Sequence, residues 1–227
     1  MGAGNRPRRG RRTDRKPALT HFVTPIHDRV YRENARFVSG LLQGEKDFPA
    51  RAPRVLDVGC HKCFLKGFLP AGSRYTGLNI DKTGEDVVPV DLNRGRLPAA
   101  DAAYDAVVCT DVLEHLFCPE KIAAEIQRCL KPGGIFVISL PNDIGITVLL
   151  SFLLKWFRRT VDPIPVQRFD HHWKFSYAVS TAFFREAGLA VTRAELYVGP
   201  YIRFLTPLIR LFPSLCTTWF FVGRKPA

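Results

Sequence analysis

Short apolar runs alternate with longer segments of helical spacing, and this alternation constrains the fold more than any other feature of the sequence. Each run has the length and composition of one strand that is buried on both faces of a sheet. Strands that alternate with helices favour a parallel sheet with helices on both faces. The predicted strands are 54–58, 75–80, 87–90, 106–109 and 135–140.

The segment between the last two of these strands predicts an amphipathic helix over 119–130. It places Ile122, Ile126 and Leu130 on one side and charged residues elsewhere. The following Lys-Pro-Gly-Gly of 131–134 predicts its end, because proline and glycine interrupt helices. A second helix is predicted before the first strand, over 24–42.

The sequence changes in texture beyond Asn142. Helices are predicted over 144–156 and 176–187, and two further strands over 189–198 and 215–222. The segment 161–170 is predicted to be a loop. Between the last two strands lies an apolar segment, 199–213, that contains three prolines.

Charge is concentrated near the start of the chain. The net charge is +12, and half of it comes from residues 5–16, which hold seven basic residues and one acid. Such a run predicts a disordered tail over 1–20, which serves either solubility, the favoured interpretation, or contact with nucleic acid or lipid headgroups. No signal peptide or transmembrane segment is expected: 144–154 is too short for a span, and prolines and an arginine interrupt 204–222. We therefore expect a cytoplasmic protein, with contact at a membrane surface as the alternative.

Six cysteines in 227 residues are too few to suggest a disulfide framework. Cys60 and Cys63 form a C-x-x-C, but no second ligand pair is present at a spacing suited to zinc. A thioredoxin-like redox pair is a minor alternative. The favoured interpretation is that both thiols pack beside a ligand site.

The first predicted strand ends in Asp57 and Gly59 and is followed by His61 and Cys63. In open parallel sheets ligands bind at the carboxyl ends of the strands, and a glycine there allows close approach of the backbone. The segment resembles the first motif of class I S-adenosylmethionine-dependent methyltransferases, D-x-G-x-G-x-G. His61 and Cys63 stand where that family has its second and third glycines.

Four later segments resemble the same family in the correct order: 75–81, 90–92, 104–110, and 128–142 with its R-x-L-K-P-G-G and P-N. The resemblance implies a single doubly wound α/β domain, Rossmann-like, with seven mostly parallel strands and an antiparallel last strand. It implies an N-terminal helical segment over 21–50 and a methyltransferase domain over 51–227. Within the domain, 51–142 would bind the cofactor and 143–214 would form the cap and acceptor region.

S-adenosylmethionine is the cofactor that the resemblance implies. Asn79 stands where the family has an acid for the ribose hydroxyls, and Asp81 is close enough to replace it. The implied cofactor-binding residues are Asp57, Gly59, Cys60, His61, Asn79, Asp81, Asp91, Leu92 and Thr110.

Glu114 and His115 follow the fourth predicted strand and resemble the E-H pair of small-molecule O-methyltransferases. The resemblance implies that His115, with Glu114, removes the proton of a hydroxyl acceptor, a task that suits a group of near-neutral pKa. The alternative is that His115 only caps or packs a helix.

Asp111, Glu114 and His115 also resemble the E-x-x-E-H metal motif of ubiquinone-type O-methyltransferases and of small-RNA 3′-terminal 2′-O-methyltransferases. In the metal-dependent alternative His172 would be the fourth ligand, although a site without metal is favoured. The expected function is methyl transfer to a small-molecule, lipid or sugar acceptor at oxygen. The alternatives are a metal-assisted RNA 2′-O-methyltransferase, a catalytically silent partner protein and a redox protein.

Overall fold

The computed structural model describes residues 25–142 and 171–226. Seven strands form a single sheet in the order β3-β2-β1-β4-β5-β7-β6. Its strands are β1 (Arg54–Val58), β2 (Arg74–Asn79), β3 (Val87–Pro89), β4 (Tyr104–Thr110), β5 (Leu130–Pro141), β6 (Ala190–Tyr197) and β7 (Thr218–Arg224). The first five strands are parallel to one another, and β7 is antiparallel to both β5 and β6. The predicted doubly wound, seven-stranded sheet with an antiparallel last strand is thereby confirmed.

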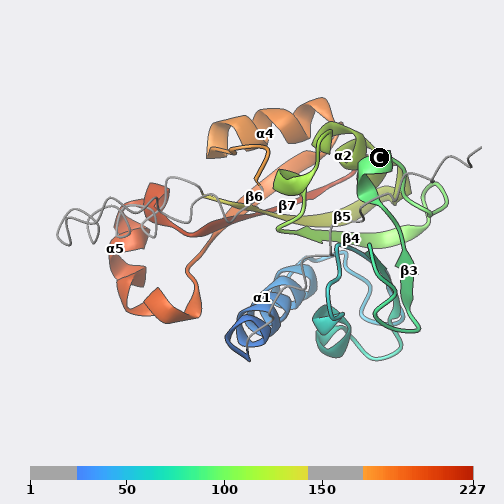
Figure 1. Cartoon of the computed structure of the whole chain (residues 1–227), viewed down its shortest axis with the longest axis horizontal. Coiled ribbons are helices and arrows are strands. Elements are labelled where there is room, and N and C mark those ends of the chain that lie inside the picture. The colour runs from blue at the N-terminus through green and yellow to red at the C-terminus, as the bar shows by residue number, and fades with distance from the viewer. Residues whose placement is uncertain (1–24, 143–170, 227) are drawn as a thin grey trace, which may run out of the picture.

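Helices cover both faces of the sheet. Helix α1 (Pro25–Gln43) lies on one face, and α2 (Pro119–Cys129) and α4 (Tyr177–Glu186) lie on the other (Figure 1). Alternation along β4 divides its side chains between the two cores. Ala106 and Val108 pack with α1, whereas Val107 and Cys109 pack in the core that includes α2 and α4.

Helix ends follow local chemistry. Ser176 caps α4, because its hydroxyl accepts a hydrogen bond from the backbone N–H of Val179. Helix α2 begins with Pro119 and ends at Cys129, one residue before the predicted end. The Lys-Pro-Gly-Gly segment then enters β5 at once, and Gly133 adopts the left-handed conformation with φ of 73°.

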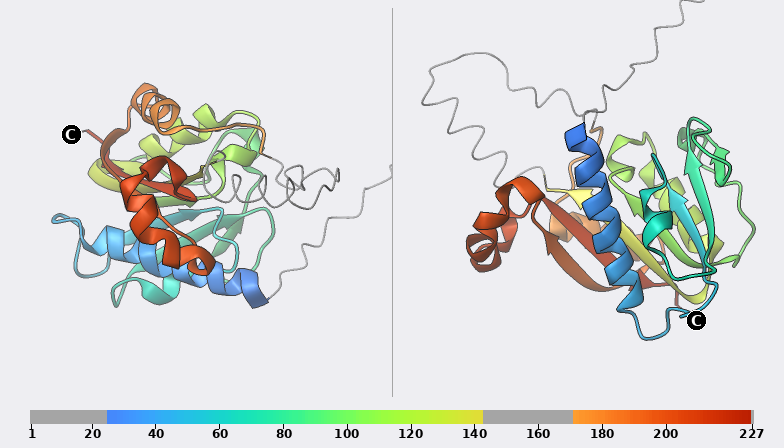
Figure 2. Two further views of the ribbon diagram at one scale, coloured as in Figure 1. Left: turned by 90° about the vertical axis from the view of Figure 1, so that its left-hand side faces the viewer. Right: turned by 90° about the horizontal axis from the view of Figure 1, so that it is seen from below.

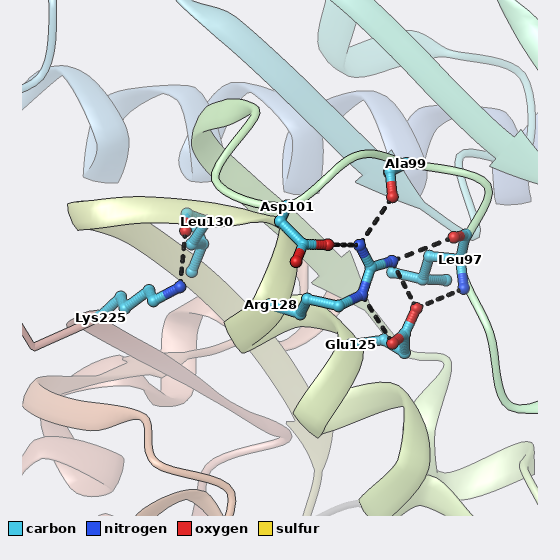
Figure 3. A network of polar contacts seen from close by, with 7 residues as sticks. All are labelled: Leu97, Ala99, Asp101, Glu125, Arg128, Leu130 and Lys225. Carbon is cyan, nitrogen blue, oxygen red and sulfur yellow. Dashed lines mark hydrogen bonds and ion pairs between the residues drawn. The ribbon is translucent and has the colours of Figure 1, made fainter.

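Arg128 at the end of α2 holds the loop that precedes β4 (Figure 3). Its guanidinium donates to both carboxylate oxygens of Glu125, at 2.8 and 2.6 Å. It also donates to the Asp101 carboxylate and to the carbonyl oxygens of Ala99 and Leu97. Glu125 completes the network by accepting from the backbone N–H of Leu97 at 2.8 Å. Five directed bonds from one planar group fix this loop against α2.

The structure corrects the sequence predictions at several element boundaries. The strand predicted over 135–140 already begins at Leu130. The alternation of strands with helices predicts a helix after the first strand, whereas the structure has only the 3-10 turn η1 (Phe64–Phe68) there. The last strand starts at Thr218 rather than at 215. The segment 199–213 contains helical turns, and each of its three prolines begins one: η5 (Pro200–Leu205), α5 (Thr206–Leu211, with Pro207 in its first turn) and η6 (Pro213–Leu215).

The predicted tail over 1–20, the helix over 144–156 and the loop over 161–170 lie outside the described residues. Among the residues that are described, no helix is long and apolar enough to cross a membrane.

Candidate functional site

A pocket lies at the carboxyl ends of β1 and β4, where parallel sheets present their ligand sites. We call it the β1–β4 pocket. Five of the predicted cofactor residues line it: Asp57, Gly59, Cys60, His61 and Thr110. The structure thus brings together residues 53 positions apart in the chain through the parallel pairing of β1 with β4.

All three glycine positions of the first motif have the backbone conformation that favours glycine. Gly59 has φ of 78°, and His61 and Cys63, which replace the other two glycines, have φ of 46° and 56°. L-residues adopt this region at a cost of roughly 1–2 kcal/mol. The loop therefore keeps the turn of the motif although two of its glycines are absent.

Gly59 is required by packing within the protein. A Cβ built on Gly59 would lie 2.2 Å from Cγ2 of Val112. Val112 directly precedes η3 (Leu113–His115), the turn that carries Glu114 and His115. Gly59 therefore allows the first-strand loop and the η3 turn to lie in contact.

Asp57 is the buried charge of the pocket. Its side chain is 5% exposed and accepts a 2.6 Å hydrogen bond from the Tyr75 hydroxyl. Burial raises the pKa of Asp57 to about 6, and the Tyr75 hydrogen bond opposes this rise. Burial and the nearby Asp57 likewise raise the pKa of the Cys60 thiol. The Sγ atoms of Cys60 and Cys63 lie 3.6 Å apart as free thiols.

Helix α1 contributes two residues that the sequence analysis missed, Tyr31 and Asn34. The Tyr31 ring lies against the His61 imidazole with 4.7 Å between centroids. Burial, and then the charges of Asp111 and Glu114, raise the pKa of Tyr31. The Oδ1 of Asn34 is buried with no hydrogen-bond partner in the described part of the chain. No spacing within α1 marks these two residues, and only the packing of α1 against the sheet shows that they line the pocket.

Four other predicted cofactor residues do not line the β1–β4 pocket. Asn79 is half-buried at the end of β2, and Asp81 is exposed. Asp91 is exposed and caps η2 (Leu92–Arg94) by accepting from the Asn93 N–H, while Leu92 is half-buried. They lie at and beyond the ends of β2 and β3, the next two strands toward the edge of the sheet.

Glu114 and His115 lie together with His171, and the structure corrects the choice of His172 here. One potential ligand atom from each of Glu114, His115 and His171 lies within 4.8 Å of the other two. The His115 and His171 rings have centroids 4.8 Å apart, whereas His172 stacks on Phe117. Glu114 is 1% exposed, so this cluster joins a buried carboxylate to two imidazoles.

Backbone hydrogen bonds hold the segment that carries His171 and His172 against Glu114. The N–H groups of His172 and Trp173 donate to the Glu114 carbonyl, and the Trp173 indole N–H donates to the Leu116 carbonyl at 3.0 Å. The His171 ring packs against His115 and the His172 ring against Phe117, so His171 is the histidine that lies beside His115.

Asp111, the other predicted metal residue, is engaged elsewhere. Its backbone N–H donates to the Ser139 hydroxyl, which donates in turn to the Asp111 carboxylate at 2.8 Å. Burial raises the pKa of Asp111, and the nearby His115 and His171 oppose the rise. One carboxylate and two imidazoles are a donor set that suits a divalent ion such as zinc or iron, so Glu114, His115 and His171 fit a metal better than the predicted set.

Comparison with known proteins shows the family to which this chain belongs. Residues 26–194 match the model of a methyltransferase domain. The chain is 34% identical over 99 residues to a protein of Mycolicibacterium smegmatis named "probable S-adenosylmethionine-dependent methyltransferase", covering 40% of this chain and 38% of that protein. It is 25% identical over 183 residues to the ubiquinone biosynthesis O-methyltransferase of Bordetella avium, covering 74% and 70%.

The mycobacterial matches span only part of the proteins concerned: 38% of the M. smegmatis protein and 52% of an uncharacterised methyltransferase of Mycobacterium leprae. Among solved structures, the magnesium protoporphyrin IX methyltransferase of Synechocystis shares the fold with a TM-score of 0.61 and 15% identity, over 89% of this chain and 88% of that one. The motifs, the sheet order and the domain match agree, and the chain belongs to the class I S-adenosylmethionine-dependent methyltransferase family.

Proposed function

We propose that this protein transfers the methyl group of S-adenosylmethionine to a hydroxyl of a small-molecule, lipid or sugar acceptor. One observation carries the proposal: Glu114 and His115 of the cluster lie on the turn that follows directly from β4, the strand whose end lines the β1–β4 pocket. Thr110 lines the pocket as the last residue of β4, and η3 begins three residues later. A cofactor group and an acceptor group would therefore lie side by side.

The pocket residues suit a cationic ligand. S-adenosylmethionine supplies an activated methyl group on a positively charged sulfonium. Asp57 is an acid held beside the pocket wall, and its charged form is disfavoured by burial unless a positive group is near. Asn34 offers a buried carbonyl oxygen with an open hydrogen-bonding position. We propose that these two residues, together with Thr110 and the backbone of 59–61, hold the cofactor, with Asn79, Asp81, Asp91 and Leu92 at the more distant adenosine end.

His115 is the proposed general base. Methyl transfer is an in-line displacement, so the protein must hold the acceptor oxygen close to the methyl group and remove its proton. The His115 side chain is exposed and able to reach an acceptor, whereas Glu114 is buried behind it. Glu114 and His171 would orient the imidazole and stabilise its protonated form.

Oxygen is proposed as the acceptor atom on two grounds. A histidine base is needed for a hydroxyl and much less for an unprotonated amine. Two ubiquinone biosynthesis O-methyltransferases that are similar to this chain match it over 70–74% of its length. Structural neighbours that methylate nitrogen share the fold alone, as the 16% identity of the didemethyltoxoflavin N1-methyltransferase shows.

The test is methyl transfer from isotopically labelled S-adenosylmethionine to a panel of matched phenol, catechol and aniline acceptors. The proposal expects methylated hydroxyls, and His115→Ala should lower turnover by about 10²–10⁴-fold while affinity for S-adenosylhomocysteine stays unchanged. His172→Ala is the matched control, because His172 stacks on Phe117 away from the cluster. Methylation of the anilines alone would contradict the choice of oxygen, and equal turnover of both variants would contradict the role of His115.

A metal-assisted reaction is the second candidate, favoured by the Glu114–His115–His171 donor set. A divalent ion there would bind the acceptor oxygens and lower their pKa. Dialysis against a chelator distinguishes the two. Activity that is lost and then restored by one divalent metal, together with metal binding that His171→Ala abolishes and His172→Ala does not, would replace the first mechanism by the second.

A further inference from the structure

Residues 199–216 form a helical arm between β6 and β7. It contains η5, α5 and η6 and stands beyond the end of the sheet (Figures 1 and 2). The arm has a small core of its own, because Ile209 and Cys216 are fully buried and pack with Val198. Its fold is therefore held by a set of residues separate from those on its outer side.

The outer side of the arm is apolar and exposed. Phe204 is 77% exposed, Leu211 72%, Phe212 51% and Leu208 42%. Leu208 and Leu211 lie in α5. Phe204 lies in the preceding 3-10 turn η5, and Phe212 directly follows the end of α5. Four of the large exposed hydrophobic side chains of the described chain thus gather within nine residues, and none of them belongs to the small core.

The charge of the arm is positive. No acid occurs after Glu195, whereas Arg203 and Arg210 lie within the exposed segment. Arg203 donates to Glu33 of α1 at 2.8 Å and so ties the arm to the body of the protein. For Arg210 no ion pair is found with the residues that the structure describes, and this guanidinium is exposed beside the apolar face.

We propose that this arm docks on the surface of an anionic lipid bilayer, with Phe204, Leu208, Leu211 and Phe212 inserted at the level of the headgroups. Short amphipathic helices with phenylalanine and leucine on one face and arginine beside it bind in this way. Anionic headgroups supply the negative charge that Arg210 lacks within the described protein. A protein partner would need a matching acidic and apolar surface, and a second copy of this chain, at +12, would repel the first.

The position of the arm has a consequence for the site. β6 is antiparallel to β7, and β7 is antiparallel to β5, so β6 runs in the same direction as β4 and β5. The arm therefore leaves the sheet at the carboxyl edge, where the β1–β4 pocket lies, and Glu33, its contact on α1, is two residues from Tyr31. A docked arm would bring the pocket edge close to the bilayer, from which a lipid-soluble acceptor could enter. This last step rests on the proposed function, whereas the lipid contact does not.

The experiment is flotation of the full chain with vesicles of phosphatidylcholine alone or mixed with phosphatidylglycerol. The protein should float with the mixed vesicles, and the double variant F204S/F212S should bind them about tenfold or more weakly, because two exposed aromatic side chains lose their contact with lipid. Val179→Ser is the matched control, since Val179 is 52% exposed on α4, on the other face of the sheet. It should float as the unmodified chain does.

Two readouts keep the outcomes separate. Calorimetry with S-adenosylhomocysteine should give the same affinity for F204S/F212S and V179S, and this result would show that both variants are folded. If neither the variants nor the unmodified chain binds the cofactor product, the proposed function is contradicted, but the lipid contact is not. Equal flotation of the two variants would overturn the arm as the anchor and assign lipid binding to other basic segments. A dimer in light scattering that F204S/F212S dissociates, without binding to vesicles, would overturn it in favour of a second copy.

Discussion

The Tyr75 hydroxyl of β2 donates a 2.6 Å hydrogen bond to the Asp57 carboxylate of β1, at the floor of the β1–β4 pocket. Parallel pairing of these strands places the two side chains within reach. This hydrogen bond stabilises the charged form of the Asp57 carboxylate, which burial removes from water. The pairing of β1 with β2 therefore affects the protonation of an acid that lines the pocket.

Asp57→Asn should change the dependence of stability on pH. The unfolded carboxyl releases its proton near pH 4 and the folded one near pH 6, so the stability that Asp57 contributes is present below about pH 4 and is lost as pH rises through 6. Relative to the parent, the variant should gain about 3 kcal/mol in free energy of unfolding between pH 4 and pH 8. Urea denaturation at both pH values measures this, and a difference that does not vary with pH would contradict the raised pKa.

Gly59→Ala should be strongly destabilising. The added Cβ meets Val112, and alanine at φ of 78° is strained, so a loss of about 3 kcal/mol is expected from the two effects. When Val112→Ala is added to the Gly59→Ala variant, it should recover only the part of the lost stability that comes from the clash, about 1–2 kcal/mol. Thermal denaturation of the single and double variants forms the cycle. Strict additivity would show that Gly59 and Val112 are not in contact.

Cys63 tests the cost of the missing glycines. Cys63→Gly should be more stable than Cys63→Ala by about 1 kcal/mol, because both variants lose the thiol but only alanine retains the left-handed strain at φ of 56°. Comparing the two variants with each other, rather than with the parent, cancels the change in stability that comes from losing the thiol. If alanine is the more stable of the two, the loop does not hold this conformation in solution.

Arg128→Lys should cost about 2 kcal/mol despite keeping the charge, because an ammonium group cannot make the two-pronged contact with Glu125 and reach the carbonyls of the loop at once. Arg29→Lys is the control, since its pair with Glu33 is exposed on α1 and should change stability by no more than about 0.5 kcal/mol. Equal effects in urea denaturation would mean that the network of Figure 3 contributes little.

The strands of the sheet could be predicted because a short stretch of sequence determines each of them. Each buried strand is an apolar run, and the glycine and proline residues around 131–134 end α2 wherever the rest of the chain lies. The motif residues Asp57, Gly59 and Thr110 followed from the same pattern, since the end of a predicted strand fixes the edge on which a side chain lies.

The parts of the candidate site that could not be predicted depend on contacts between segments far apart in the sequence. Tyr31 and Asn34 reach the pocket only because α1 packs across β1 and β4, and no spacing within α1 encodes that placement. The choice between His171 and His172 depends on two backbone bonds to the Glu114 carbonyl, more than fifty residues away.

Titration calorimetry of the full chain with S-adenosylhomocysteine tests the assignment of the β1–β4 pocket to the cofactor. We expect one site per chain, unaffected by His115→Ala and weakened about tenfold or more by Asn34→Ala, which removes a buried polar group from the pocket wall. No heat of binding at millimolar ligand, with a protein shown to be folded by its thermal transition, would contradict the assignment of the β1–β4 pocket to the cofactor.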